Sequence, residues 1–370
     1  MRVLLVTNYK PDGQASMARY ASLLSQQLRE GGFNVETISP TPVMTEFVGK
    51  ESPLFRWLAY IDKFVLFPPV LRRLSHRADI VHVCDHSNSF YLRWTGKTPT
   101  LITAHDALAI RSALGHFPQN PTKWSGKKLQ RWILRGLVHT HKVVCVSQKT
   151  RQDFEALLPR GPSMTVIPNP LNGNFRPAPE NEVNAVREIC KFAPEDEYLL
   201  QVGAAAWYKN RLGVIRIMGE LRKSPRFSKV KLVFAGSPLD SDLRKKAEEL
   251  GEVIEYVWPS DEQLRALYSG ALALLYPSLE EGFGWPVVEA QACGCPVITS
   301  ARSPMKEVSG GAAILIDPED AAGAAATILA RIRETAWLRE AGLANIKNYS
   351  MDTTKERYLD VYREIVHASK

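Results

Sequence analysis

The chain has 370 residues, more than the roughly 250 to 300 at which one hydrophobic core tends to divide, so two domains are expected. Hydrophobic residues make up 45% and charged residues 23%, a composition that excludes a disordered or fibrous protein. The net charge of +8 is uneven: residues 1–168 hold 22 Lys and Arg against 11 Asp and Glu, so the first half favours an anionic partner.

The first half alternates short apolar segments with amphipathic ones. The opening segment, VLLVT at 3–7, is too short for the apolar region of a signal peptide, and no uncharged apolar run approaches the ~18 residues of a transmembrane helix. A helix is expected over 16–30, where Gly31 ends it. Further apolar segments lie at 34–39, 79–84, 99–105 and 142–147. Such strands, separated by helices, predict a parallel sheet covered on both faces, in a protein of the cytosol.

Two segments of the first half combine basic residues with a possible interface. Residues 55–77 interleave large apolar side chains such as Trp57 with basic ones such as Arg56, and residues 107–152 contain nine basic residues and no acid. This pattern predicts a lipid-linked or otherwise anionic acceptor and peripheral contact at the inner face of a membrane. The alternative is that the large apolar side chains pack in the core and that the domain is basic without contacting a membrane. No nucleic-acid partner is expected.

Two short motifs imitate metal sites. HVCDH offers His82, Cys84 and His86, but a zinc site needs a further ligand, and the five cysteines of the chain include no C-x-x-C pair. The DSD sequence at 240–242 directly precedes LRKKAEEL, so a helix N-cap at Asp240 is the better interpretation. No metal is expected.

Residues 166–177, VIPNPLNGNFRP, are dense in Pro, Asn and Gly and predict an interdomain linker. A second series of apolar strands is expected at 198–204, 230–236, 253–257, 271–278, 296–300 and 312–317. The fold class is therefore α/β with two doubly wound domains, 1–168 and 169–351, whose ligand lies where the carboxyl ends of the sheets face each other across a cleft. A capped helix over 352–370 is expected to pack back on the first domain.

The stretch EEGFGWPVVEAQACGCPVITS, residues 280–300, places two glutamates beside a glycine-rich turn. Pro286 suits the first residue of a helix, which puts Glu281 in the preceding loop and Glu289 in the first turn. Gly282 and Gly284 leave backbone N–H groups uncovered beside a helix N-terminus, a site for hydroxyls or phosphates. The alternative is a solvated loop acid and a carboxylate favoured by the helix dipole alone.

This stretch strongly resembles the Glu-x7-Glu signature of retaining glycosyltransferases of family four, the glycosyl transferases group 1. These enzymes have the GT-B fold, two Rossmann-like domains facing across a cleft. Further segments resemble the family in the same order along the chain: VVCVSQKTRQDF, VIPNPLNGNF, QVGAAAWYKN, KLVFAG, YVWPSDEQLRALYSGALALLYPS and SPMKEVSGGAAILIDPED.

The resemblance implies roles for residues of the second half. Glu281 would contact hydroxyls of the donor sugar, with the backbone of Gly282, Phe283 and Gly284 beside it. Glu289 would hold the ribose diol of the nucleotide, where a carboxylate accepts two hydrogen bonds of about 1.5 to 3 kcal/mol each.

The remaining implied residues come from both halves. Lys209, in the segment that also holds Gly203 and Asn210, would place a cation on the donor diphosphate and stabilise the leaving group. The alternative for Lys209 is a solvated residue at a helix start. His105, in LITAHDA, would touch the donor sugar near the reacting carbon, and Gly13, in KPDGQAS, would lie near the phosphates.

The chain also departs from the family pattern. The common Gly-Gly of the first loop is replaced by Asp12-Gly13-Gln14, and Ala204 and Tyr208 stand where relatives carry Arg. One phosphate-binding cation of the family pattern is therefore missing. Either Arg211 substitutes for it, or the donor preference is weaker or altered.

The implied function is a retaining hexosyltransferase of polysaccharide biosynthesis. It would move a hexose from GDP-mannose or a UDP-hexose to a glycan or lipid-linked saccharide, with His105, Glu281 and Lys209 as catalytic residues and with neither cofactor nor metal. A nucleotide-sugar hydrolase or epimerase and a non-catalytic GT-B binding module are the alternatives.

Overall fold

The structure is a computed structural model that describes residues 1–171 and 173–368. Residue 172, inside the predicted linker, and residues 369–370, at the end of the predicted last helix, lie outside the described residues. The chain forms two compact units: unit 1 comprises Met1–Asn169 and the segment from Met351 onward, and unit 2 comprises Pro170–Ser350. The boundary expected from the sequence lies one residue earlier.

Unit 1 contains a six-stranded, fully parallel sheet in the order β2-β1-β3-β4-β5-β6. Its strands are β1 (Arg2–Val6), β2 (Asn34–Ile38), β3 (Ile80–Val83), β4 (Thr100–Ala104), β5 (Lys142–Cys145) and β6 (Ser163–Val166). Five of them lie on the predicted apolar segments. The sixth, β6, was missed because this edge strand is partly exposed and only four residues long, and Val166 belongs to the stretch assigned to the linker.

Helices cover both faces of this sheet. They are α1 (Ala15–Glu30), α2 (Phe55–Ile61), α3 (Phe67–Ser75), α4 (Leu108–Ala113), α5 (Trp124–Leu137), α6 (Gln148–Leu157) and α15 (Met351–Ala368). A π-helical turn, Asp62–Leu66, joins α2 to α3. One core cluster combines Leu71 of α3, Leu137 of α5 and Phe154 of α6 with the strands, so the apolar strand residues are covered as the sequence predicted.

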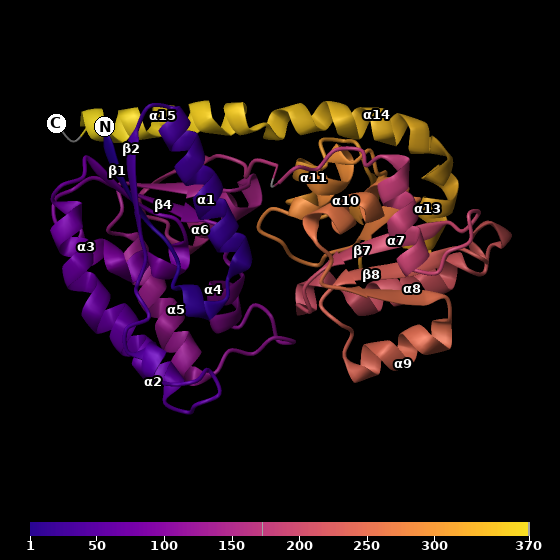
Figure 1. The fold of residues 1–370 in the computed structure, drawn as a ribbon, viewed down its shortest axis with the longest axis horizontal. Coiled ribbons are helices and arrows are strands. Elements are labelled where there is room, and N and C mark those ends of the chain that lie inside the picture. The colour runs from indigo at the N-terminus through magenta and orange to yellow at the C-terminus, as the bar shows by residue number, and fades with distance from the viewer. Residues whose placement is uncertain (172, 369–370) are drawn as a thin grey trace. The chain divides into compact units, whose positions relative to one another are not determined.

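The last helix, α15, packs on unit 1 beside α1 (Figure 1). The hydroxyl of Tyr358 lies 2.6 Å from that of Tyr20 on α1. The hydroxyl of Tyr362 lies 2.5 Å from Nδ1 of His82 on β3, whose Nε2 lies 2.8 Å from Thr103 Oγ1 on β4. These side chains are buried, and each polar group has a partner, so α15 is joined to the sheet by hydrogen bonds as well as apolar contact.

Unit 2 contains a second parallel sheet of six strands, in the order β12-β11-β10-β7-β8-β9. The strands are β7 (Tyr198–Gly203), β8 (Lys231–Gly236), β9 (Val253–Val257), β10 (Ala273–Tyr276), β11 (Val297–Ser300) and β12 (Ile314–Ile316). The predicted fold class, α/β with two doubly wound parallel sheets, is confirmed.

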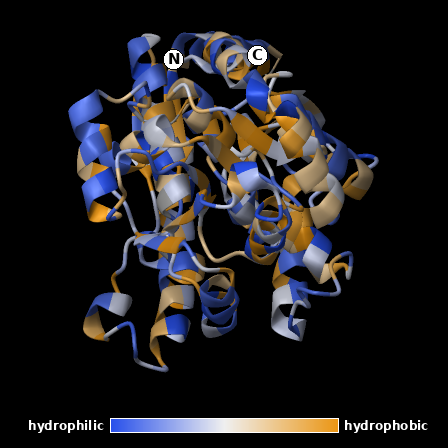
Figure 2. Ribbon diagram, turned by 90° about the vertical axis from the view of Figure 1, so that its right-hand side faces the viewer, coloured by the Kyte–Doolittle hydropathy of each residue, from blue (hydrophilic) through white to orange (hydrophobic). Residues whose placement is uncertain are grey.

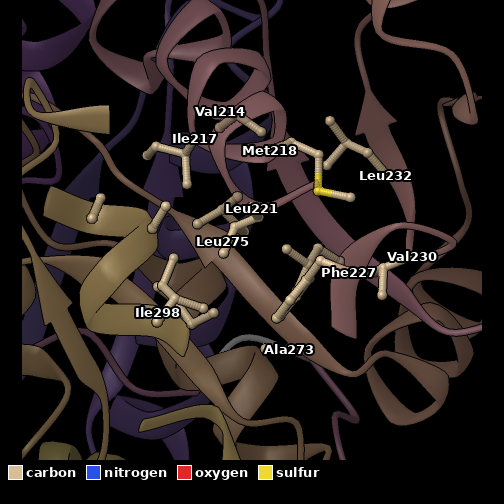
Figure 3. Close-up of a cluster of buried hydrophobic side chains, with 14 of the residues drawn as sticks. Val214, Ile217, Met218, Leu221, Phe227, Val230, Leu232, Ala273, Leu275 and Ile298 are labelled. Carbon is tan, nitrogen blue, oxygen red and sulfur yellow. The ribbon is translucent and has the colours of Figure 1, made fainter. Parts of the chain in front are cut away.

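The helices of unit 2 are α7 (Glu180–Ile189), α8 (Arg211–Leu221), α9 (Ser241–Leu250), α10 (Asp261–Gly270), α11 (Trp285–Ala292), α12 (Met305–Val308), α13 (Ala321–Arg331) and α14 (Thr335–Asn345). Figure 3 shows Val214, Met218 and Leu221 of α8 gathered with strand residues such as Leu275 and Ile298. All five side chains are fully buried. This cluster fixes α8, and with it the loop that precedes α8, against the sheet.

Hydropathy follows the layers in each unit. Figure 2 shows hydrophobic colour along strands and a mixture of both colours along the covering helices. Within the described part of the chain, no helix combines the length and the apolar character needed to cross a membrane.

Acid is expected to destabilise unit 1 through His82. Burial lowers the pKa of His82 to about 3 from an ordinary value of 6.5, so the unfolded chain binds a proton that the folded protein does not between these pH values. The free energy of unfolding should therefore fall as the pH drops through this window, with a contribution of up to about 1.4 kcal/mol per pH unit. Urea unfolding measured at several pH values checks this expectation.

The matched variants are His82→Gln, which removes the buried imidazole, and His116→Gln, which removes an exposed one. His82→Gln should give a shallower dependence of unfolding free energy on pH than the wild type, and His116→Gln should leave the slope unchanged. Equal slopes for the wild type and His82→Gln would show that His82 does not carry the effect.

Candidate functional site

The strand order of unit 2 places a topological switch point at the carboxyl ends of β7 and β10. These strands are neighbours in the sheet although β8 and β9 separate them in the chain, so the chain leaves them toward opposite sides. Such a switch point is where open α/β sheets bind ligands. The β7 strand is followed by Lys209 and the β10 strand by Glu281, so two predicted site residues from distant parts of the sequence come to one edge.

Lys209 and Glu281 form an ion pair at this edge. Lys209 Nζ lies 2.7 Å from Glu281 Oε1, and the two side chains are only 12% and 9% exposed. A pair so shielded from water interacts more strongly than a surface pair. The interpretation of Lys209 as a solvated residue at a helix start is therefore wrong.

Two neighbours that the sequence argument missed complete this cluster. Tyr276, the last residue of β10, donates its hydroxyl to Glu281 Oε1 at 2.7 Å and also contacts Lys209 Nζ. Ser278 donates to the same oxygen at 3.0 Å. Among the described residues, the recorded donors to this carboxylate all reach Oε1, which leaves Oε2 to accept from a ligand hydroxyl. The sequence feature that could have identified Tyr276 is a tyrosine at the end of an otherwise apolar strand.

The hydroxyl of Tyr276 is kept protonated by its surroundings. Burial, and then the charge of Glu281, raise the pKa of Tyr276 well above its ordinary value of 10. The phenol therefore remains a hydrogen-bond donor, and it orients Glu281 rather than exchanging a proton.

The helix after Glu281 is preceded by a glycine whose backbone conformation other residue types rarely adopt. Gly284 is the N-cap of α11 with a φ of 100°, and a Cβ there would lie 2.2 Å from Met305 Cε. The helix starts at Trp285, one residue before Pro286, so Glu289 is its fifth residue and lies in the second turn. The prediction that Glu289 lies in the first turn is wrong, and capping of the helix does not explain this residue.

Glu289 is buried at 6% exposure, and Tyr268 of α10 donates to its Oε2 at 3.0 Å. Burying a carboxylate is costly unless it is hydrogen-bonded, so a position of this kind indicates a specific role. Burial, and then the neighbouring Glu289, raise the pKa of Tyr268 well above its ordinary value, so Tyr268 also remains a donor.

The loop between the two glutamates is held by aromatic packing. Phe283 is 5% exposed and meets Tyr349 edge-on, with ring centroids 5.7 Å apart. The indole of Trp285 donates to the carbonyl of Pro170 at 3.1 Å. These contacts fix the backbone around Gly282, where the sequence predicts N–H groups that bind a ligand.

The loop after β7 is shaped by two residues with unusual backbone angles. Gly203 has a φ of 139°, and a Cβ there would touch the side chain of Lys209 at 3.4 Å. Asn210, the N-cap of α8, has a φ of 53°. Its amide donates to the carbonyls of Pro277 at 3.0 Å and Pro318 at 2.8 Å, so Asn210 joins this loop to those after β10 and β12.

Arg211 does not replace the missing phosphate-binding cation. It is 4% exposed, and its guanidinium donates to the carbonyls of Gly203 at 2.6 Å, Ser237 at 2.9 Å and Pro238 at 3.1 Å. Gly203 is the last residue of β7, and Ser237 and Pro238 follow β8, so Arg211 connects the ends of two strands. Of the two possibilities that the sequence left open, substitution for Arg at Ala204 or Tyr208 therefore does not fit the position of Arg211.

His105 follows β4 in unit 1 and is 8% exposed. Its Nε2 lies 2.9 Å from the carbonyl of Cys84, which can only accept, so Nε2 carries the proton and Nδ1 is the acceptor. The ring meets Tyr20 edge-on at 4.6 Å. Burial lowers the pKa of His105 even though nearby Asp85 acts in the opposite direction, so the imidazole is neutral.

A polar cluster lies at the switch point of unit 1, where β1 and β3 are neighbours. Asn8 Nδ2 donates to Asp85 Oδ2 at 2.6 Å and also contacts Gln14, while Asn88 Nδ2 donates to Asn8 Oδ1 at 3.2 Å. Gly13, with a φ of 70° and open space at its Cβ position, lies in the same loop as Gln14. Asp85 was not predicted because HVCDH was considered only as a metal motif, and Asn8 was not predicted because its partner lies 77 positions away.

Burial opposes the ionisation of Asp85, but the electrostatic influence of the nearby imidazoles of His86 and His105 and the hydrogen bonds from Asn8 and Ser87 hold the pKa of Asp85 below its ordinary value. This carboxylate is therefore charged, although it is only 4% exposed.

The two metal-like motifs have other partners. Asp240 accepts from the backbone N–H of Leu243 at 2.9 Å and caps α9, as predicted. His82 is engaged with Tyr362 and Thr103. Among the described residues, no group of three or more His, Cys, Asp or Glu side chains is arranged to hold a metal ion.

Sequence comparison identifies two families along the chain. The family "Glycosyl transferases group 1" matches residues 183–341, and "Glycosyltransferase Family 4" matches residues 17–174. The chain is 25% identical over 323 residues to O-antigen chain mannosyltransferase B of Escherichia coli, covering 83% of each chain. It is 27% identical over 291 residues to D-inositol 3-phosphate glycosyltransferase of Mycolicibacterium smegmatis, covering 73% of this chain and 62% of the relative.

Solved structures with a similar fold include sucrose-phosphate synthase from Thermosynechococcus elongatus, at a TM-score of 0.73 and 19% identity over the full length of both chains. The HepE protein of Anabaena, solved with UDP and glucose, gives 0.72 and 15% identity, covering 98% of this chain and 99% of that one. WaaG, a glycosyltransferase involved in lipopolysaccharide biosynthesis, gives 0.68 and 17% identity, covering 98% and 99%.

Replacement of Arg211 should lower stability rather than nucleotide affinity. Arg211→Met removes the donors of three carbonyls beside β7 and β8, and each unmade bond costs roughly 1 to 3 kcal/mol when the group stays buried. We expect a loss of at least about 2 kcal/mol in the free energy of unfolding, measured with urea. Arg216→Met, on the exposed face of the same helix, is the matched control and should change stability little. Wild-type stability in Arg211→Met would contradict the structural role.

Proposed function

Because the chain belongs to the group 1 glycosyltransferases with the GT-B fold, we propose that it transfers a hexose from a nucleoside diphosphate sugar to a saccharide, with retention of the anomeric configuration. The observation that carries this proposal is the Lys209–Glu281 pair at the switch point of unit 2. It combines a cation for a diphosphate with a carboxylate for sugar hydroxyls, and the buried carboxylate of Glu289 lies on the following helix.

Each part of the donor would bind to the protein group whose chemistry suits it. Lys209 and the N-terminus of α8 would take the diphosphate, so the charge is assigned to protein groups rather than to a metal. Glu281 would accept from sugar hydroxyls through Oε2, beside the backbone of the loop that Phe283 anchors. Glu289 would accept from the two ribose hydroxyls. His105, with Nδ1 as its acceptor, would hold a sugar hydroxyl from unit 1.

Transfer would proceed by attack on the face of the leaving group. The bond between the anomeric carbon and the β-phosphate oxygen breaks, its electron pair stays on the diphosphate, and an acceptor hydroxyl forms the new glycosidic bond on the same face. The departing phosphate oxygen takes the proton of that hydroxyl, so no side chain must act as general base. Lys209 would stabilise the charge that develops on the leaving phosphate.

The relatives support the proposed classes of donor and acceptor. The mannosyltransferase relative acts in O-antigen chains, and the HepE protein of Anabaena, a structural neighbour, has been solved in complex with UDP-glucose. We propose GDP-mannose or a UDP-hexose as donor and a glycan or lipid-linked saccharide as acceptor.

Removal of Glu289 should weaken nucleotide binding. Each lost charged hydrogen bond is worth about 1.5 to 3 kcal/mol, so Glu289→Ala should reduce the affinity for GDP or UDP at least tenfold, measured by isothermal titration. Glu289→Gln retains the volume and one acceptor and should lose less. Urea unfolding identifies any loss that comes from the fold, since Tyr268 loses its partner in Glu289→Ala.

The variant Glu281→Gln should distinguish nucleotide binding from turnover of the sugar donor. Lys209 is released from its ion pair in this variant, so GDP or UDP should bind at least as tightly as in the wild type, whereas turnover with the sugar donor should fall roughly a hundredfold. Glu280→Gln, at the neighbouring acid, is the control and should retain turnover. Free sugar released without any transfer to a panel of saccharides would identify a hydrolase instead.

Peripheral membrane contact through unit 1 is the second part of the proposal. Large apolar side chains are exposed around the α2–α3 segment, including Phe47 at 81%, Trp57 at 67% and Val65 at 60%. On α5, Trp124 is 70% exposed, and Lys128 Nζ lies 3.8 Å from its ring centroid. Exposed aromatic residues beside basic ones suit the interface of an anionic bilayer.

Unit 1 should therefore bind anionic liposomes at low salt and release them as salt is raised. Phe47→Ser combined with Trp57→Ser should reduce the bound fraction several-fold in a flotation assay, because both side chains would enter the interface. Trp337→Ser is the matched control, since Trp337 is 50% exposed on a helix of unit 2. Equal binding to neutral and anionic liposomes would contradict the electrostatic part.

A further inference from the structure

A groove of about 590 Å³ runs along α1 within unit 1. It begins at the carboxyl end of β1, where Asn8 and Gln14 lie, and it follows α1 past Ser22 and Gln26 to Arg29. Gln14 and Arg29 are 15 positions apart, which corresponds to about 22 Å along a helix axis. The groove therefore extends from the polar cluster at the switch point for most of the length of α1.

The groove is a built surface rather than a gap left by poor packing. Ser22, Ser25 and Arg29 are three or four residues apart and share one side of α1. The opposite side carries Tyr20, hydrogen-bonded to Tyr358, and Gln27, whose amide donates to the carbonyl of Met351 at 2.9 Å. The helix thus packs its other side against α15 and keeps this polar side for the groove.

The lining side chains suit a hydroxylated ligand. Hydroxyl and amide side chains supply most of the polar groups, and they can both donate and accept. Apolar surface from Ala18, Ala21 and the ring of Tyr9 lies between them and suits the C–H faces of a sugar ring. Among the described residues that line the groove there are two cations, Lys10 and Arg29, and no carboxylate. A saccharide with an anionic group matches this combination.

Arg29 is placed to meet such a group. Its Nη2 donates to the carbonyl of Val35 at 3.2 Å, which fixes the guanidinium at the far end of the groove. A guanidinium carries five N–H donors, so the others remain for a phosphate or carboxylate, which Arg binds in bidentate fashion.

We propose that this groove binds the part of the acceptor beyond the reacting sugar, and that this part is a saccharide bearing a phosphate or carboxylate. The proposal rests on the transferase function proposed above, and it assigns the hydroxyl-bearing portion to Ser22, Ser25 and Gln26 and the anion to Arg29. None of these residues belongs to the donor site of unit 2.

The experiment measures three probes by isothermal titration, with GDP or UDP present to occupy unit 2. The probes are a hexose 1-phosphate, glucuronate and a neutral methyl hexoside. The wild type should bind at least one anionic probe about tenfold more tightly than the neutral one. Preference for the phosphate or for glucuronate identifies which anion the acceptor carries, and both outcomes support the groove.

Two matched pairs of variants locate the binding. Gln26→Trp fills the groove, and Gln152→Trp places the same side chain on the exposed side of α6. Arg29→Gln removes the anchoring charge, and Arg160→Gln removes an exposed charge elsewhere in unit 1. Gln26→Trp should abolish binding of the probes, and Arg29→Gln should remove the preference for the anionic one, while both controls behave as the wild type.

The proposal is overturned if no probe binds the wild type, or if Gln26→Trp and Gln152→Trp bind the probes equally. Titration of GDP and UDP alone reports on unit 2 independently. Loss of nucleotide binding with intact probe binding would refute the transferase function but not the groove, and the reverse result would refute the groove alone.

Discussion

Both sheets are parallel and covered by helices on their two faces, and this constraint decides where polar chemistry can lie. A strand buried on both sides has little room for unpartnered polar groups, so such residues collect where strands end. In unit 2 the loops after β7 and β10 carry Lys209 and Glu281. In unit 1 the ends of β1 and β3 carry Asn8 and Asp85. The apolar cores thus hold the polar clusters at fixed positions.

The ion pair of unit 2 joins Lys209, proposed to bind the donor diphosphate, to Glu281, proposed to bind the donor sugar. Lys209 pairs with Glu281, so neither is left as an isolated charge although both side chains are largely buried. In the proposed donor complex a diphosphate would compete with Glu281 for the ammonium group. The carboxylate would remain supported by Tyr276 and Ser278 and would be available to sugar hydroxyls. Occupation of the proposed phosphate position would therefore prepare the proposed sugar position.

The sequence predicted what depends on local pattern and missed what depends on distant partners. Apolar runs and the glycine turn before α11 located most strands and the loop of Glu281. The edge strand β6 lacked that signal because it is partly exposed. For Arg211 the sequence left two possibilities open, a phosphate-binding cation or an altered donor preference. Its partners Ser237 and Pro238 lie 26 and 27 positions away, so the local pattern could not show that the guanidinium binds their carbonyls. The hydrogen bond from Tyr268 to Glu289 was not predicted either, because Tyr268 lies 21 positions before Glu289.

The charges of unit 1 give the proposed groove a direction. At the end near β1 and β3 the ionised Asp85 accepts from Asn8, a residue that lines the groove, so a negative charge lies close to this end. Arg29 lies at the opposite end, about 22 Å from Gln14 along α1 by helix geometry. An acceptor with hydroxyls at one end and an anionic group at the other is stabilised in one orientation and destabilised in the reverse. That orientation directs a hydroxyl toward the carboxyl ends of the strands, where His105 also lies.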